Sequence, residues 1–201
     1  MTGKFTLFLS VGIKFFFVLT PFFALSMFLS LTEGYSESRR HRLALLVSGA
    51  VTVLCLLLFF AGNQLFSLFG ITLNSFRIGA GALLFLSAVG LVQGKTASAG
   101  ADRNGDIVVV PLAIPIIVGP AATGTLMVLG AELEGLTAQS LGCLALLIAV
   151  ACLGIVLLLS SLIQRYLGNR GIGILSKLTG LVLAALAAQM IMTGVQGFMA
   201  N

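Results

Sequence analysis

The sequence predicts an all-α polytopic membrane protein, folded as a single transmembrane domain over residues 1–201. Hydrophobic residues make up 59% of the chain and charged residues only 8%, whereas a soluble domain carries about 25% charged residues. The apolar residues are grouped in runs of roughly the 20 residues that a membrane helix needs. The 24 glycines are typical of membrane helices that pack closely together. This composition excludes a water-soluble globule.

Six apolar stretches are long enough, or nearly long enough, to span the bilayer. They are Phe5–Leu31, Leu43–Gly62, Ser75–Gln93, Ile107–Ala131, Gln139–Ile163 and Ile174–Phe198. The stretches are apolar on all sides, whereas the strands of a membrane β-barrel alternate between polar and apolar residues. Backbone groups in lipid must be hydrogen-bonded within the segment. Each stretch is therefore predicted to be a transmembrane helix.

Only three charged residues fall inside these stretches. Arg77 and Lys177 lie in first turns, from which a long side chain can reach the interface. Lys14 lies deeper, unless the first span begins near Phe15. The sequence therefore predicts a membrane centre without charged side chains.

Basic residues are concentrated in the connections that follow the first, third and fifth spans. These residues are Arg39, Arg40, Arg42, Lys95, Arg103, Arg165 and Arg170. Because Lys and Arg are enriched in cytoplasmic loops, we expect both termini to lie outside the cytoplasm. The loop Arg39–Arg42 is interpreted as a topology signal that contacts anionic lipid headgroups, in preference to a site for a protein partner. The net charge of +5 belongs to these loops and does not indicate nucleic acid as a partner.

The side chains that enzymes commonly use are scarce. His41 is the only histidine, and no acidic pair lies within a span. Cys55, Cys143 and Cys152 lie inside apolar stretches without metal-ligand or redox spacing. No glycine-rich phosphate-binding loop is present. We therefore expect a protein that is not an enzyme and that has no metal site and no cofactor.

Three of the four prolines, Pro111, Pro115 and Pro120, fall within the fourth predicted span. An interior proline removes a helical hydrogen bond and clashes with the preceding turn, so we expect the helix to be interrupted in Val118–Ala121. A broken helix leaves free N–H groups at one end and free C=O groups at the other, which attract anions and cations respectively. Such breaks mark binding sites in transporters. For Pro21 in the first span, a simple kink stabilised by neighbouring hydroxyl groups is the favoured interpretation.

The two proline regions are related by a constant offset. Pro21 and Pro120 are 99 residues apart, as are Glu33 and Glu132. At an offset of 100, Arg77 matches Lys177, and Leu83, Leu86 and Ala88 match Leu183, Leu186 and Ala188. Three spans per half is an odd number, so the halves would insert in opposite orientations. The sequence thus predicts a 3+3 inverted-topology repeat, of about residues 1–100 and 101–201, with broken or kinked first and fourth helices that bring the two prolines together.

The segment Val110–Pro115, followed by Gly119-Pro120-Ala121, resembles the fourth-span signature of the MarC family. Supporting matches are Phe28–Thr32, Phe69-Gly70-Ile71, Phe76-Arg77-Ile78, Gly180-Leu181, Gln189 and Gly194. The similarity covers nearly the whole chain. The resemblance implies a six-span bacterial inner-membrane protein, grouped with neutral amino acid transporters and related to LysE-type exporters. Some members resemble proton-coupled carriers of glycine and alanine.

The first span departs from the family pattern, which usually has Asn or Asp, then Pro, an apolar residue, Gly, two further residues and a second Pro. Here Thr20 replaces the amide or acid, Phe23 replaces the Gly, and Ser26 replaces the second Pro. Only Pro21 is kept. The resemblance therefore implies a first half-site that is bulkier and less polar than in other members, with a changed substrate specificity or impaired transport.

The favoured function is a secondary transporter for a small zwitterionic solute, held by the partial charges of half-helix ends. The candidate substrate-binding residues are Thr20, Pro21, Ser26, Pro115, Gly119, Pro120, Ala121, Thr123 and Gln189. For Gln189, an interhelical hydrogen bond is the alternative role. Coupling to protons through the helix-end glutamates, coupling to sodium through broken-helix carbonyls, and uncoupled diffusion all stay open.

Two other functions are alternatives. One is a non-transporting membrane scaffold or regulatory subunit. The other is a drug or organic-cation exporter, which usually needs a carboxylate inside the membrane, whereas Glu33 and Glu132 lie at helix ends. Small, Gly-rich helices are also compatible with a homo-oligomer.

Overall fold

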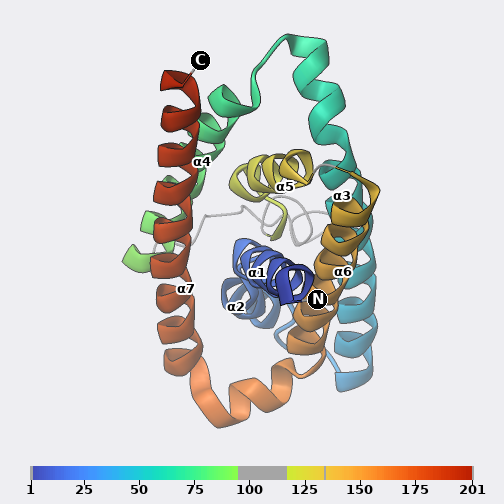
Figure 1. The fold of residues 1–201 in the computed structure, drawn as a ribbon. Helices are drawn as coiled ribbons and strands as arrows, with labels where there is room; N and C mark the ends of the chain where they lie inside the picture. Colours follow the sequence, from blue (N-terminus) through green and yellow to red (C-terminus); the bar gives the residue numbers. More distant parts are fainter. Residues whose placement is uncertain (1, 95–116, 134, 201) are drawn as a thin grey trace.

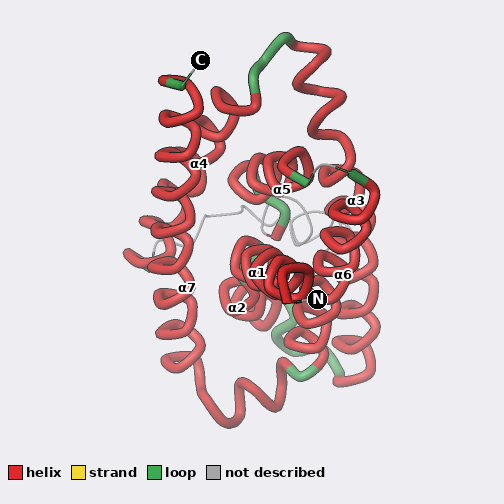
Figure 2. Tube along the Cα trace, in the orientation of Figure 1, coloured by secondary structure: helices red, strands yellow, loops and turns green. Residues whose placement is uncertain are grey.

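The computed structural model describes residues 2–94, 117–133 and 135–200. These residues fold into helices joined by short connections, and no strand occurs among them (Figure 2). The helices are α1 (Thr2–Val18), α2 (Pro21–Leu31), α3 (Glu37–Phe69), α4 (Leu73–Gln93), α5 (Pro120–Glu132), α6 (Leu136–Leu158) and α7 (Ser160–Met199). The all-α expectation is confirmed.

Five segments of the described chain are long and apolar enough to cross a membrane. They are Phe8–Leu31, Glu37–Gly62, Leu73–Gln93, Leu136–Leu158 and Ser160–Met199. The protein is therefore a multi-pass membrane protein. In the fourth predicted span, α5 has 13 residues and is too short to cross alone, while residues 107–116 lie outside the described part of the chain.

Several boundaries differ from those expected. α1 continues from Thr2 past Lys14, so the first span does not begin at Phe15. The basic cluster Arg39–Arg42 lies in the first turns of α3 rather than in a loop. Ser36 caps the start of this helix, since its hydroxyl accepts a hydrogen bond from the Arg39 amide at 3.4 Å. α7 begins soon after α6 ends and is kinked at Gly168, whose φ of 64° is accessible mainly to glycine.

Arg40 from the basic cluster has a structural role. Its Nη1 donates to Ser161 Oγ at 2.7 Å and its Nη2 donates to the carbonyl oxygen of Thr32 at 3.2 Å. Arg39 stacks on the Tyr35 ring, with Cζ 4.0 Å from the ring centroid. Arg40 therefore ties the end of α2 to the start of α7, so at least this member of the cluster is not free to contact lipid.

The long helices form two antiparallel pairs that flank the broken ones. Figure 1 shows α4 beside α7 on one side and α3 beside α6 on the other, with α1, α2 and α5 between the pairs. Across this arrangement, α1 contacts α6, α2 contacts α7, and α5 contacts both α3 and α4. The C-terminus lies at the same end as the α3–α4 turn, opposite the α2–α3 and α6–α7 connections (Figure 1).

Two glycines allow α4 and α7 to approach closely. A Cβ atom on Gly81 would lie 3.1 Å from the carbonyl oxygen of Ala187, and a Cβ atom on Gly180 would lie 2.9 Å from the carbonyl oxygen of Ala88. Removing a side chain in this way is typical of closely packed membrane helices. Gly81 and Gly180 are 99 residues apart, and so are Ala88 and Ala187. The two contacts are therefore reciprocal under a shift of 99 residues.

The burial of equivalent leucines also supports an offset of 99 residues between the two halves. Leu84 and Leu183, which are 99 residues apart, are 1% and 0% exposed. The matches at an offset of 100 are wrong as spatial equivalents, because Leu83 is 46% exposed while Leu183 is buried. A shift of one residue rotates a position by about 100° around a helix, which moves it from the core to the lipid face.

Candidate functional site

The first span is broken at Thr20. α1 ends at Val18, and Thr20 adopts the left-handed conformation with φ 47° and ψ 56°. It is the only non-glycine residue with positive φ in the described ranges. Pro21 then begins α2 without an amide hydrogen to donate. The helix therefore stops at Val18 and restarts at Pro21, rather than bending continuously through the proline.

The second break lies at Gly119, as expected for Val118–Ala121. Gly119 is extended, with φ −81° and ψ 178°, and Pro120 begins α5. The amide of Thr123 donates to the Gly119 carbonyl at 2.9 Å, just as the amide of Ala24 donates to the Thr20 carbonyl at 2.9 Å. Neither helix start has a side-chain cap. Both therefore present N–H groups with the partial positive charge of a helix N-terminus.

The two breaks lie close together in the fold. Val18, at the end of α1, belongs to the same buried cluster as Ala121 and Ala122 at the start of α5. Leu84 of α4 and Leu183 of α7 also belong to this cluster. The end of one half-helix therefore faces the start of another, next to the α4–α7 pair.

The predicted site residues do not all share one cavity. Pro21 and Ala121 are buried; Thr20, Ser26, Gly119 and Thr123 are half-buried; Pro120 and Gln189 are exposed; and Pro115 lies outside the described residues. Pro120 and Thr123 line a groove beside α4, whereas Gln189 lines a second, separate cavity. Neither cavity is lined by Thr20, Pro21, Ser26, Gly119 or Ala121.

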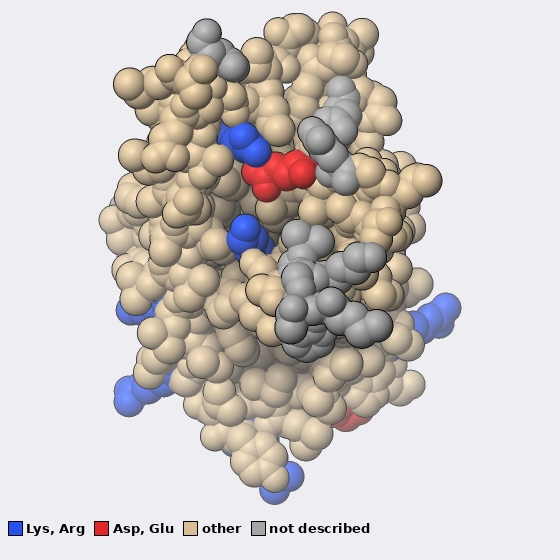
Figure 3. All heavy atoms as spheres, viewed as in Figure 1, with Lys and Arg blue, Asp and Glu red and all other residues tan. Residues whose placement is uncertain are grey.

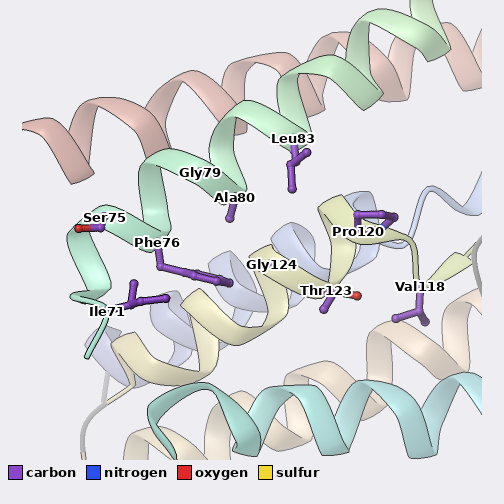
Figure 4. Close-up of a pocket in the computed structure, with 10 residues that line it drawn as sticks. All are labelled: Ile71, Ser75, Phe76, Gly79, Ala80, Leu83, Val118, Pro120, Thr123 and Gly124. Atoms are coloured by element: carbon purple, nitrogen blue, oxygen red, sulfur yellow. The ribbon is translucent and has the colours of Figure 1, made fainter. Parts of the chain in front are cut away.

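The groove beside α4 has a volume of about 810 Å³ and is almost entirely apolar. Figure 4 shows Phe76, Ala80 and Leu83 pointing from α4 toward α5. Among the described residues that line it, only Ser75 and Thr123 have polar side chains. None of the described residues in its wall is charged, so these residues offer no counter-ion to a zwitterion.

The second cavity has a volume of about 310 Å³, at the small end of the usual range for ligand pockets of about 300–1,000 Å³. Four helices contribute to it at helical spacing, so that one face of each is used. The lining residues are Lys14 and Val18 of α1, Arg77 of α4, Thr125, Leu129 and Glu132 of α5, and Leu186, Gln189, Met190 and Thr193 of α7. We call this space the charged cavity.

An ion pair forms one wall of the charged cavity. Arg77 Nε lies 2.9 Å from Glu132 Oε1, and Arg77 Nη1 donates to Asn74 Oδ1 at 2.8 Å. The side chains of Arg77 and Glu132 are 17% and 30% exposed. Glu132 is the last residue of α5, where the helix dipole opposes a carboxylate, and the pairing with Arg77 offsets this cost.

The charged cavity brings together three residues that the sequence did not group. Lys14 lies within the first span, and Arg77 and Glu132 lie at helix ends, yet all three line one cavity. On the face seen in Figure 3, acidic atoms lie between two groups of basic atoms, in the region where α5 and α1 lie in Figure 1. The surrounding surface of that face is mostly uncharged (Figure 3).

Gln189 bonds within its own helix rather than between helices. Its Nε2 lies 3.5 Å from Thr193 Oγ1, and the Thr193 hydroxyl donates to the Gln189 carbonyl at 2.8 Å. The alternative of an interhelical hydrogen bond is therefore not what the described structure contains. The Gln189 side chain instead contributes an amide to the wall of the charged cavity.

Comparison with known proteins identifies the family. The model of the MarC family of integral membrane proteins matches residues 5–199. The chain belongs to the MarC family. A UPF0056 membrane protein of Methanocaldococcus jannaschii is 33% identical over 191 residues, covering 90% of this chain and 92% of the relative. The UPF0056 inner membrane protein YhgN of Escherichia coli is 29% identical over 194 residues, covering 95% of this chain and 97% of YhgN. No solved structure matches this chain.

The fold gives a physical reason for the family pattern at Thr20. The family pattern that the resemblance implies has Asn or Asp before the first-span proline, and in this MarC-family protein that position is left-handed. Asn and Asp tolerate the left-handed conformation because their short side chains bond locally, whereas a β-branched residue is strained there. Thr20 is therefore an unfavourable residue at a backbone position that the break requires.

The sequence did not predict that Lys14, Arg77 and Glu132 of this MarC-family protein line one cavity. In the predicted six-span topology, Arg77 opens the third span and Glu132 closes the fourth, which places both on the same side of the membrane. This shared side was the available signal, together with their opposite charges. Lys14 had no such signal, because its contribution depends on how α1 packs against α5 and α7.

Proposed function

We propose that this MarC-family protein is a secondary transporter, rather than an enzyme, for small neutral amino acids such as glycine or alanine. The observation that carries the proposal is the meeting of the end of α1 with the proline-initiated start of α5, since Val18 shares a buried cluster with Ala121 and Ala122. Discontinuous helices of this kind form the substrate sites of many secondary transporters. Transport proceeds by alternating access around the broken first and fourth helices, with a small zwitterionic solute as the ligand.

The proposal includes a 3+3 inverted-topology repeat of six spans. Its support is the constant offset of 99 residues, which relates Pro21 to Pro120 and the contact of Gly81 with Ala187 to that of Gly180 with Ala88. The contact of α2 with α7 likewise corresponds to that of α5 with α4. Two such halves can exchange conformations, which is the structural basis of alternating access.

The proposed orientation places both termini on the non-cytoplasmic side of the inner membrane. Its support is the concentration of arginines at one end of the molecule, where Arg39 and Arg42 begin α3 and Arg165 and Arg170 begin α7. Positive charge of this kind is retained in the cytoplasm. Arg42, which is exposed, then lies where it contacts anionic headgroups.

The charged cavity argues against an organic-cation exporter. Such a carrier needs a carboxylate that can bind the cation. Glu132 is already paired with Arg77, and Lys14 lines the same cavity. The cavity therefore holds two cationic side chains to one carboxylate, which repels a cationic solute.

The direct test is uptake by proteoliposomes that contain the purified protein. We expect counterflow of radiolabelled glycine or alanine, strongly reduced by Pro120→Ala, which removes the residue that initiates α5. Gly173→Ala is the matched control, because a Cβ atom there meets nothing within 4 Å. The absence of counterflow with every small amino acid would contradict the proposal. A scaffold would show altered stability or assembly in Pro120→Ala without any flux to lose.

A further inference from the structure

The described residues that line the charged cavity include one more cation than anions. Lys14 and Arg77 supply two positive charges and Glu132 one negative charge. The Lys14 side chain is half-buried within the first span and makes no ion pair with any residue that the structure describes. A cation in a membrane segment is costly unless an anion or water solvates it, so the cavity is suited to receive a negative group.

Arg77 is held in place by two hydrogen bonds, but not every N–H group of its guanidinium has a partner among the described residues. Its Nε bonds to Glu132 and its Nη1 bonds to Asn74. Its Nη2 has no hydrogen-bond partner among the described residues, which leaves a donor on a guanidinium whose position is already set. A planar guanidinium with free donors is suited to carboxylate recognition.

The remaining walls limit the size and chemistry of the ligand. Val18, Leu129, Leu186 and Met190 are apolar and enclose a space of about 310 Å³. Gln189 supplies an amide oxygen, and Glu132 supplies a second carboxylate oxygen, both of which accept hydrogen bonds. The cavity also adjoins the first break, because Val18 lies two residues before Thr20.

We propose that the charged cavity is a carboxylate-binding site, in which Lys14 and Arg77 bind the carboxylate of a small solute. One added negative charge balances the cavity, whereas a dianion such as phosphate over-compensates it. When the solute is an amino acid, Glu132 and Gln189 face its ammonium group. The inference rests on the proposed transport function only for the identity of the solute. In this site the main ligands of the carboxylate are the side chains of Lys14 and Arg77, and not the N–H groups at the helix ends.

The test uses the full chain in lipid nanodiscs and three probes of matched size, measured by isothermal titration calorimetry. Alanine has both charged groups, propionate lacks the ammonium, and alaninamide lacks the carboxylate. We expect alanine and propionate to bind and alaninamide to bind at least about tenfold more weakly. Equal binding of alanine and propionate assigns recognition to the carboxylate alone. Binding of alaninamide as tight as that of alanine overturns the proposal.

Variants locate the site. Lys14→Gln is expected to weaken alanine binding at least about tenfold, Lys14→Arg to retain it, and Lys177→Gln to leave it unchanged, since Lys177 is exposed and lies outside the cavity. Glu132→Gln is expected to have the opposite effect on affinity. It should tighten propionate binding, because a competing carboxylate is removed. Unchanged alanine affinity in Lys14→Gln, or weaker propionate binding in Glu132→Gln, overturns the proposal.

The two proposals fail separately. Propionate binding that depends on Lys14, without uptake of any amino acid, keeps the carboxylate site and removes the transport function. Alanine uptake that is unchanged in Lys14→Gln keeps the transport function and removes the carboxylate site.

Discussion

Thr20 shows how much one backbone position can decide in this protein. The break in the first span requires a residue with positive φ immediately before Pro21. A β-branched side chain at such a position clashes with the backbone, and its hydroxyl makes no cap bond that would offset the strain. Thr20 therefore stores strain next to the proposed substrate path.

Replacing Thr20 should relieve this strain. We expect Thr20→Gly and Thr20→Asn each to raise the free energy of unfolding by about 1 kcal/mol, because both residues tolerate the left-handed region. Thermal unfolding in detergent, followed by circular dichroism, measures the change. Thr52→Asn, inside the regular helix α3, is the control and should give no gain. A lower melting temperature for both Thr20 variants would show that the threonine is favourable there.

The Arg77–Glu132 pair is expected to contribute measurably to stability. A double-mutant cycle with Arg77→Gln and Glu132→Gln should give a coupling energy of about 1 kcal/mol, since the pair is short and partly shielded from solvent. The pair of His41 and Glu37, at 3.9 Å with side chains 53% and 66% exposed, is the comparison and should couple more weakly. Strict additivity at Arg77 and Glu132 would contradict the assignment of a structural ion pair.

At the scale of helices, the contact between α4 and α7 depends on glycine. α4 and α7 touch at Gly81 and Gly180, where the opposing groups are backbone carbonyls that cannot rotate away. The glycine content predicted close packing, but many glycines of the chain face open space. Which glycines form the contacts depends on the rotation of each helix, and the apolar pattern does not reveal it because the helices are apolar on every face.

A matched pair of substitutions on α7 tests this contact. Gly180→Ala should lower the free energy of unfolding by about 1–3 kcal/mol, because its Cβ would lie 2.9 Å from the Ala88 carbonyl oxygen. Gly173→Ala on the same helix should be neutral or slightly stabilising, since nothing lies within 4 Å of its Cβ. Chemical denaturation in mixed micelles compares the two. Equal stability of both variants would mean that α4 and α7 do not approach as described.

At the scale of the whole molecule, the chain divides into two ends of different charge. Exposed positions at both ends allow the orientation to be measured, since Tyr166 is 83% exposed and Leu136 is 87% exposed. Tyr166 lies near the basic start of α7, close to the end of α6. Leu136 is the first residue of α6 and therefore lies at the opposite end of α6 from Tyr166. The proposed topology therefore places these two residues on opposite sides of the membrane.

Cysteine labelling checks this topology. In a variant without Cys55, Cys143 and Cys152, we expect Tyr166→Cys to react with an impermeant maleimide only in inside-out vesicles, and Leu136→Cys only in right-side-out vesicles. The expectation follows from the retention of positive charge in the cytoplasm. The reverse pattern would invert the molecule, and labelling of both residues from one side would contradict the span between them.

Composition and proline placement were enough to predict an all-helical membrane protein, interruption near Pro120 and an offset of 99 residues between the two prolines. These features are local, since each depends on the length of an apolar run or on the missing amide hydrogen of one residue. The full break at Thr20, the contacts of Gly81 with Ala187 and of Gly180 with Ala88, and the meeting of Lys14, Arg77 and Glu132 required the tertiary structure. In a chain that is apolar on every helix face, the hydrophobic pattern carries no rotational information, so only the packing of four helices determines which few charged side chains share a cavity.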